Sequence, residues 1–193
     1  FQDDWSPVHR LDRETSGIVL CANDTESRHV LSRAFYDHKV QKTYYAIVIG
    51  VPKEDKWTVD APIAEITGDI IRIKQAISEA GLPALTFFEK IDEKNGFSLL
   101  KVEPKTGRTH QIRVHATYSG FPLVGDKKYN FDETIFAEYM DHGYTERVAK
   151  ACYSERLCLH AAAIRFPLPS GEEKSLYCPI PEDMQKIWDD FNL

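Results

Sequence analysis

The stretch ALTFFEKIDEKNGFSLLKVEP, from Ala84 to Pro104, decides the fold of this chain. Its two ends, residues 84–91 and 97–104, each have the pattern of a β-strand. The turn between them contains Asn95-Gly96, a dipeptide typical of tight β-hairpins because both residues tolerate positive φ angles. We therefore predict two antiparallel strands that pair through this turn.

Other strands are indicated on both sides of this hairpin. Residues 42–50 (KTYYAIVIG) are β-branched and aromatic and end at a glycine, which predicts a central strand. Residues 17–23 (GIVLCAN) indicate a short buried strand, and residues 156–169 (RLCLHAAAIRFPLP) indicate a longer one. Edge strands could form at 60–66 and 69–75.

Three segments indicate helices. In residues 25–40, apolar side chains recur at helical spacing after a capping residue, Asp24 or Thr25. Residues 132–143 and 181–192 are the other two. Because strands precede, follow and separate the helices without strict alternation, we predict an α+β fold with a mixed, largely antiparallel central sheet flanked by helices and loops. The length of 193 residues suits one domain.

Composition limits the classes of function. The four cysteines show no CxxC spacing, so we expect reduced core residues rather than a disulfide framework. No apolar run is long enough to span a membrane, and the first ten residues lack the pattern of a signal peptide. We therefore expect a cytoplasmic protein without membrane contact. The abrupt start of the chain also suggests that an element lies upstream.

The charge of the chain is unevenly distributed. A net charge of −6 by itself argues against a nucleic-acid partner. However, residues 101–130 contain six Lys and Arg against two acidic residues, whereas residues 131–193 contain six against twelve. A local basic patch matters more to a phosphate backbone than the sum over the chain. The basic segment could therefore contact a nucleic acid, or it could be a solvated loop.

Residues 7–20 (PVHRLDRETSGIVL) crowd polar groups around one carboxylate. Asp12 lies between Arg10 and Arg13, and a carboxylate beside cations is held in its ionised form. Such a group could be a nucleophile, a base or only a structural ion-pair partner or turn cap.

A second polar segment covers residues 104–115 (PKTGRTHQIRVH). After a turn, polar residues alternate with apolar ones, which fits either a strand with a polar face or the first turns of a helix. Arg113 is a candidate partner for Asp12, because guanidinium and carboxylate groups match as planar forks. The simpler alternative is an ordinary surface strand.

Histidines and lysines suggest further sites. His9, His110, His115 and His160 could form a metal site, but no carboxylate or cysteine lies at supporting spacing, so we expect no metal and treat His110 as a hydrogen-bonded core residue. Residues 120–129 (GFPLVGDKKY) could bind phosphates or could simply be a connecting loop. Either of two strand tyrosines, at positions 44 and 45, could stack on a planar base.

Together these motifs resemble the RluA-like pseudouridine synthases. HRLDRETSG (9–17) resembles the family pattern HRLDxxTSG, and KTYYAIVIG resembles KxYxAxVxG. Residues 106–129 resemble GRTHQIRxH followed by GxPxxGDxxY. The segments LCLHAAAIRFPLP and CPIPEDM resemble the closing strand and end of the family. The motifs occur in the family order from Val8 to Met184, across nearly the whole chain.

The resemblance implies a fold and a reaction. The fold would be a pseudouridine synthase catalytic domain over residues 1–193, lacking the usual N-terminal first strand and any separate RNA-binding domain. The reaction would convert a specific uridine in ribosomal or transfer RNA to pseudouridine, without cofactor or metal. Asp12 matches the essential aspartate, Tyr44 the tyrosine that stacks on the target base, and Arg113 the basic residue that pairs with the aspartate.

The partner implied is structured RNA, bound by a monomer. An RNA-binding module with the same fold but no turnover is the alternative, and a metal-dependent hydrolase using the histidines is a third hypothesis. The residues expected to contact RNA are Arg10, Arg13, Arg108, Thr109, His110, Gln111, Lys127 and Lys128.

Overall fold

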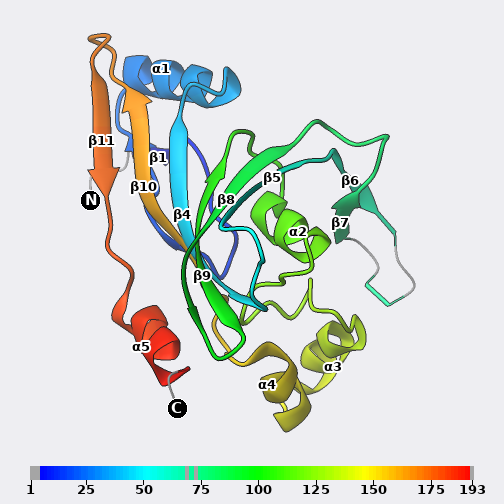
Figure 1. Ribbon diagram of the computed structural model, residues 1–193. Helices are drawn as coiled ribbons and strands as arrows, with labels where there is room; N and C mark the ends of the chain where they lie inside the picture. The colour runs from blue at the N-terminus through cyan, green and yellow to red at the C-terminus, as the bar shows by residue number, and fades with distance from the viewer. Residues whose placement is uncertain (1–4, 68–69, 72–73, 192–193) are drawn as a thin grey trace.

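The computed structural model describes residues 5–67, 70–71 and 74–191, and a twisted antiparallel sheet dominates it (Figure 1). The main sheet has seven strands, in the order β11-β10-β4-β9-β8-β5, with β2 added beside β10. Every pairing in it is antiparallel except that of β2 with β10, so the predicted α+β class with a mixed, largely antiparallel sheet is confirmed. The strands are β2 (Ser16–Gly17), β4 (Gln41–Ile49), β5 (Lys56–Asp60), β8 (Leu85–Lys94), β9 (Phe97–Pro104), β10 (Leu159–Pro167) and β11 (Glu173–Tyr177).

The hairpin at the centre of the sequence argument is present. Strands β8 and β9 pair antiparallel up to Lys94 and Phe97, which face each other across the turn. Asn95 has φ 44° and Gly96 has φ 87°. Positive φ at both central residues is what a tight hairpin turn of the primed type requires.

Strand β4 lies at the centre of the sheet, between β9 and β10, as predicted. Its side chains alternate between two apolar layers. Ala46 and Val48 pack against Ile112 and other residues on one face, whereas Ile47 packs against Met184 on the other. The two layers are covered by helix α2 (Gln111–Tyr118) and helix α5 (Glu182–Asp190) respectively.

The three predicted helices are present. Helix α1 (Thr25–Tyr36) begins after Asp24, whose side chain accepts a hydrogen bond of 2.8 Å from the backbone N–H of Ser27. Helix α3 (Thr134–His142) and helix α5 occupy the other predicted segments. The ambiguous segment after Arg108 is helix α2. A short helix, α4 (Glu146–Cys152), was not predicted.

Three predicted strands differ from the structure. Residues 17–23 do not form one strand: β2 ends at Gly17, and the chain then bends so that β3 (Cys21–Ala22) pairs with β1 (Ser6–Pro7). Strands β6 (Ile63–Ile66) and β7 (Lys74–Ile77) pair in a separate two-stranded sheet, while β5 is an edge of the main sheet. Part of the predicted strand 69–75, at residues 69, 72 and 73, lies outside the described residues.

Candidate active site

One pocket opens between three segments that are far apart in the sequence. These are the loop before β2, the start of β4, and the turn that leads from β9 into α2. Among the described residues that line it, four are Lys or Arg and one is acidic, so the pocket is electropositive. The charged lining residues are Arg10, Asp12, Lys42, Arg108 and Arg113.

Asp12 and Arg113 meet in this pocket although they are 101 residues apart. The Nη1 atom of Arg113 lies 3.4 Å from Oδ2 of Asp12, and the Asp12 side chain remains 24% exposed. The backbone carbonyl of Asp12 accepts a hydrogen bond of 3.0 Å from the N–H of Thr15, which closes a turn. The carboxylate is therefore anchored by one guanidinium N–H and still open to a ligand.

Arg113 is itself held by a buried carboxylate that the sequence reasoning missed. Its Nε donates to Oδ2 of Asp126 at 2.7 Å, and its Nη2 donates to Oδ1 at 2.9 Å. Asp126 is 1% exposed, and Oδ1 also accepts the backbone N–H groups of Lys128 and Tyr129, each at 3.0 Å. The sequence signal was the motif GDKKY, in which the acidic residue accepts the N–H groups of the residues two and three positions further on.

The electrostatics of Arg113 follow from this pairing. Burial alone would lower the pKa of the guanidinium, but Asp126 and then Asp12 raise it above its ordinary value. The guanidinium also lies over the ring of Tyr129, with Cζ 4.8 Å from the ring centre. Arg113 is thus a fixed, permanently charged group whose remaining Nη1 faces Asp12.

Tyr44 projects into the pocket from β4, whereas Tyr45 packs on the opposite side of the sheet. Of the two tyrosines considered for base stacking, Tyr44 is therefore the one at the site. Burial, with a smaller contribution from the charge of Asp12, raises the pKa of the Tyr44 hydroxyl to about 12. The phenol is consequently neutral at physiological pH.

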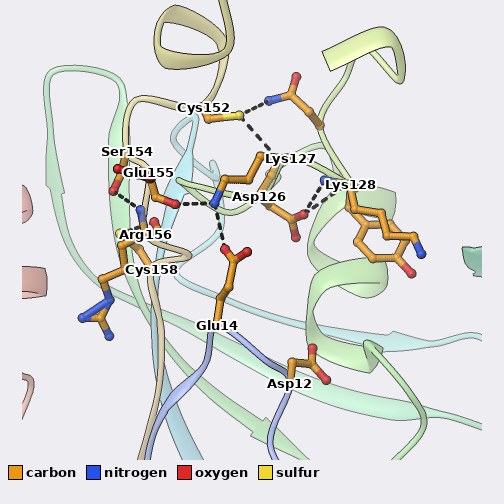
Figure 2. Close-up of polar contacts among 12 residues, drawn as sticks. Asp12, Glu14, Asp126, Lys127, Lys128, Cys152, Ser154, Glu155, Arg156 and Cys158 are labelled. Atoms are coloured by element: carbon orange, nitrogen blue, oxygen red, sulfur yellow. Dashed lines mark hydrogen bonds and ion pairs between the residues drawn. The ribbon is translucent and has the colours of Figure 1, made fainter. Parts of the chain in front are cut away.

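Lys127 does not reach the pocket. Its ammonium group pairs with Glu14 at 2.7 Å, also donates to the backbone carbonyl of Glu155, and is 5% exposed (Figure 2). Figure 2 shows Glu14 two residues beyond Asp12 on the same loop. This placement makes the expected phosphate contact of Lys127 untenable, because the charge is used inside the protein. Lys128 is half-buried, and its ammonium lies 5.6 Å from the ring centre of Phe136.

The other residues expected to contact RNA divide into two groups. Arg10, Arg13 and Thr109 are exposed around the loops that form the pocket, and Arg108 lines it while its Nε donates to the carbonyl of Pro83 at 3.0 Å. These positions suit contacts with a bound chain. In contrast, Gln111 is 3% exposed and fills a position inside the fold.

The side chain of Gln111 stabilises the turn before α2 through hydrogen bonds. Its Oε1 accepts from the Thr106 hydroxyl at 2.7 Å and from the N–H of Arg108 at 3.0 Å, while its Nε2 donates to Leu85 and Thr86. All of its polar atoms are thereby engaged, so we no longer expect it to bind RNA directly.

The histidines are dispersed. The Nδ1 atom of His110 lies 2.7 Å from the Tyr129 hydroxyl, and His115 is buried between Thr86 and the carbonyl of Ala61. His160 contacts Ser16 and the carbonyl of Cys178. Within the described part of the chain, no group of three or more His, Cys, Asp or Glu is placed to hold a metal ion, and no helix is long and apolar enough to cross a membrane.

Comparison with known proteins identifies the family. The model of the RNA pseudouridylate synthase family matches residues 2–118, more than half of the chain. The chain belongs to this family. The matched region includes Asp12, Tyr44 and Arg113, and the resemblance to the RluA-like pseudouridine synthases is confirmed.

Relatives of the pseudouridine synthase family match most of this chain. It is 37% identical over 182 residues to ribosomal large subunit pseudouridine synthase C of Vibrio vulnificus, covering 93% of the chain and 53% of the relative. It is 34% identical over 181 residues to the uncharacterized RNA pseudouridine synthase YlyB of Bacillus subtilis, covering 93% and 54%. The chain therefore spans about half the length of the curated relatives it matches.

Solved structures agree with this assignment. Human RNA pseudouridylate synthase domain containing 4 superposes with a TM-score of 0.77 at 27% identity, covering 97% of this chain and 76% of that one. Human RNA pseudouridylate synthase domain containing 1 gives 0.74 at 26% identity, covering 91% and 69%. The pseudouridine synthase fold is therefore shared over nearly the whole chain.

Proposed function

We propose that this chain isomerises a specific uridine in RNA to pseudouridine, with Asp12 as the reacting carboxylate. The observation that carries the proposal is the contact of Asp12 with Arg113 in a pocket that Tyr44 also lines. The names of several relatives, which refer to the ribosomal large subunit, favour ribosomal over transfer RNA as the substrate.

The reaction is an internal rearrangement. The bond between N1 of uracil and C1′ of ribose breaks, the uracil rotates, and a bond forms between C5 and C1′. The proton on C5 is lost to solvent and N1 takes up a proton, so that the product is an isomer of the substrate. Asp12 could attack C1′ to form a covalent intermediate, or could take a proton from C2′ to give a glycal to which the proton later returns. In both routes the carboxylate needs to be ionised, oriented and accessible.

Each neighbouring group has a defined part in this proposal. Arg113, fixed by Asp126, holds Asp12 toward the ribose. Tyr44 offers a neutral aromatic face on which the detached uracil can stack. Because the target uridine has to leave its helix or loop, which costs a few kcal/mol, cationic residues around the pocket such as Arg10 and Arg108 would offset this cost through phosphate contacts.

The test is release of tritium from large-subunit ribosomal RNA labelled at C5 of uracil, with the modified position then mapped. We expect release with one equivalent per site, unchanged by a chelator. Tight RNA binding without release would instead indicate a non-catalytic RNA-binding module. Release that a chelator abolishes would favour metal-dependent chemistry.

A further inference from the structure

Lys42 is a pocket residue to which the proposed chemistry assigns no part. It lies on β4 two positions before Tyr44, so both side chains project from the same face of the strand. Its ammonium group donates to the backbone carbonyl of Thr106 at 2.9 Å. Among the described residues, no carboxylate forms an ion pair with it.

The surroundings of Lys42 are cationic or neutral. Arg10 and Arg108 line the same pocket, and His9 has its pKa lowered, chiefly by burial and also by the charge of Lys42. Asp12, the acidic residue of the lining, faces Arg113 instead. Within the part of the chain that the structure describes, the ammonium group of Lys42 therefore has no carboxylate as its ion-pair partner.

The ammonium group of Lys42 lies beside the turn at Thr106 and Gly107, and all three residues line the pocket. A Cβ atom at Gly107 would lie 3.6 Å from Nζ of Lys42, an ordinary van der Waals distance, so the backbone of this turn lies close to the ammonium group. Burying an unpaired ammonium is costly unless it has a partner, and burial lowers the pKa of Lys42 to about 8. The charge is retained at neutral pH, where it can serve an anionic ligand.

We propose that Lys42 binds a phosphate of the RNA backbone next to the flipped uridine, an inference that rests on the proposed function. Two residues of a strand span about 7 Å. A base stacked on Tyr44 and a phosphate on Lys42 would then leave space for the ribose between them. The ligand class is a phosphodiester, held by a point charge inside the pocket rather than at its rim.

The test compares Lys42→Met with Lys42→Arg in two assays on the full chain. Binding is measured with oligouridylate at several salt concentrations, and turnover is measured by tritium release from labelled ribosomal RNA. We expect Lys42→Met to weaken binding at least 10-fold, to raise KM with kcat little changed, and to reduce the slope of log Kd against log salt by about 0.7. Lys42→Arg should restore most of the affinity.

The possible outcomes separate this inference from the proposed function. Binding and salt slope unchanged in Lys42→Met, at the level of the exposed control Lys150→Met, would overturn it. A fall in kcat with an unchanged salt slope would also overturn it. The ammonium group would then act on the uracil during the reaction rather than bind a phosphate. If wild-type protein shows no tritium release, the proposed function fails while the oligouridylate assay still tests Lys42. Melting temperatures establish that each variant is folded.

Discussion

At the scale of single residues, the site is a row of three charged side chains, Asp126, Arg113 and Asp12, each more exposed than the one before it. Asp126 is fully buried and fixes two N–H groups of Arg113, and Arg113 offers a third to Asp12, which is partly exposed. Because the buried carboxylate of Asp126 holds one edge of the guanidinium group, Arg113 cannot rotate away from Asp12. Contacts that begin in the core therefore orient the Asp12 carboxylate.

Asp126→Asn should impair catalysis without removing any atom that contacts RNA. The amide cannot accept from both sides of the guanidinium fork, and the positive charge of Arg113 loses its buried partner. We expect kcat to fall about 100-fold and the free energy of unfolding to fall by about 3 kcal/mol. Tritium release and chemical denaturation measure the two effects. The exposed Asp141→Asn is the control, and equal behaviour of both variants would contradict this role.

The pKa of Lys42 predicts a pH dependence of binding. The ammonium is charged at pH 7 and loses its proton as the pH rises through about 8, so wild-type affinity for oligouridylate should fall between pH 7 and 9. His9 and His110, whose pKa values are lowered chiefly by burial, are neutral throughout this window. Lys42→Arg should keep its affinity across it. The same fall in both proteins would assign the titration elsewhere, for example to Lys128, whose pKa is also lowered by burial.

At the scale of elements, the loop that carries Asp12 is held by contacts with residues distant in sequence. Beyond Asp12, Glu14 pairs with Lys127 and β2 pairs with β10, so the segment that follows Asp12 is fixed at two points to the later half of the chain. The central strand and the hairpin could be predicted because their patterns are local. The break within residues 17–23 could not, because it follows from where β10 and β1 lie.

The Glu14–Lys127 pair should stabilise the loop that carries Asp12. In a double-mutant cycle of Glu14→Gln and Lys127→Met, we expect a coupling of about 1 kcal/mol, together with a loss of kcat larger than the loss of RNA affinity. The exposed pair Glu146–Lys150 is the matched control, for which little coupling is expected. No coupling at the first pair, or a loss confined to affinity, would contradict a positioning role.

Gly17 should tolerate no side chain. It has φ +117°, and a Cβ atom there would lie 2.3 Å from the carbonyl oxygen of Ala161 on β10. We expect Gly17→Ala to lower the free energy of unfolding by about 3 kcal/mol. Gly120→Ala, at φ +88° with open space around it, should cost about 1 kcal/mol. Equal costs in denaturation experiments would show that β2 can move away from β10.

At the scale of the whole molecule, an acidic chain presents a cationic pocket. The acidic excess lies largely in residues 131–193, whereas Arg10, Lys42, Arg108 and Arg113 converge around a single acid, Asp12. The sequence motifs named all of these groups except Lys42 as candidate site residues, because each motif places a reactive residue type in a fixed local context.

The parts of the site that could not be predicted depend on long-range packing. Lys127 resembled a phosphate contact in the sequence, since a residue list gives its charge but not the acid that it meets 113 positions away. Asp126 was visible in a motif, but its buried position under Arg113 follows from the seating of α2 against the loop after it. The sequence shows which side chains are charged, and the fold determines which groups they contact.

The most direct test of the account is the turnover of Asp12→Asn. The amide keeps the size of the side chain but can neither attack C1′ nor accept a proton from C2′. We predict that tritium release from C5-labelled ribosomal RNA is abolished, while the melting temperature and most of the RNA affinity are retained. Release at the wild-type rate by this variant would contradict the central claim that the carboxylate held by Arg113 reacts with the ribose.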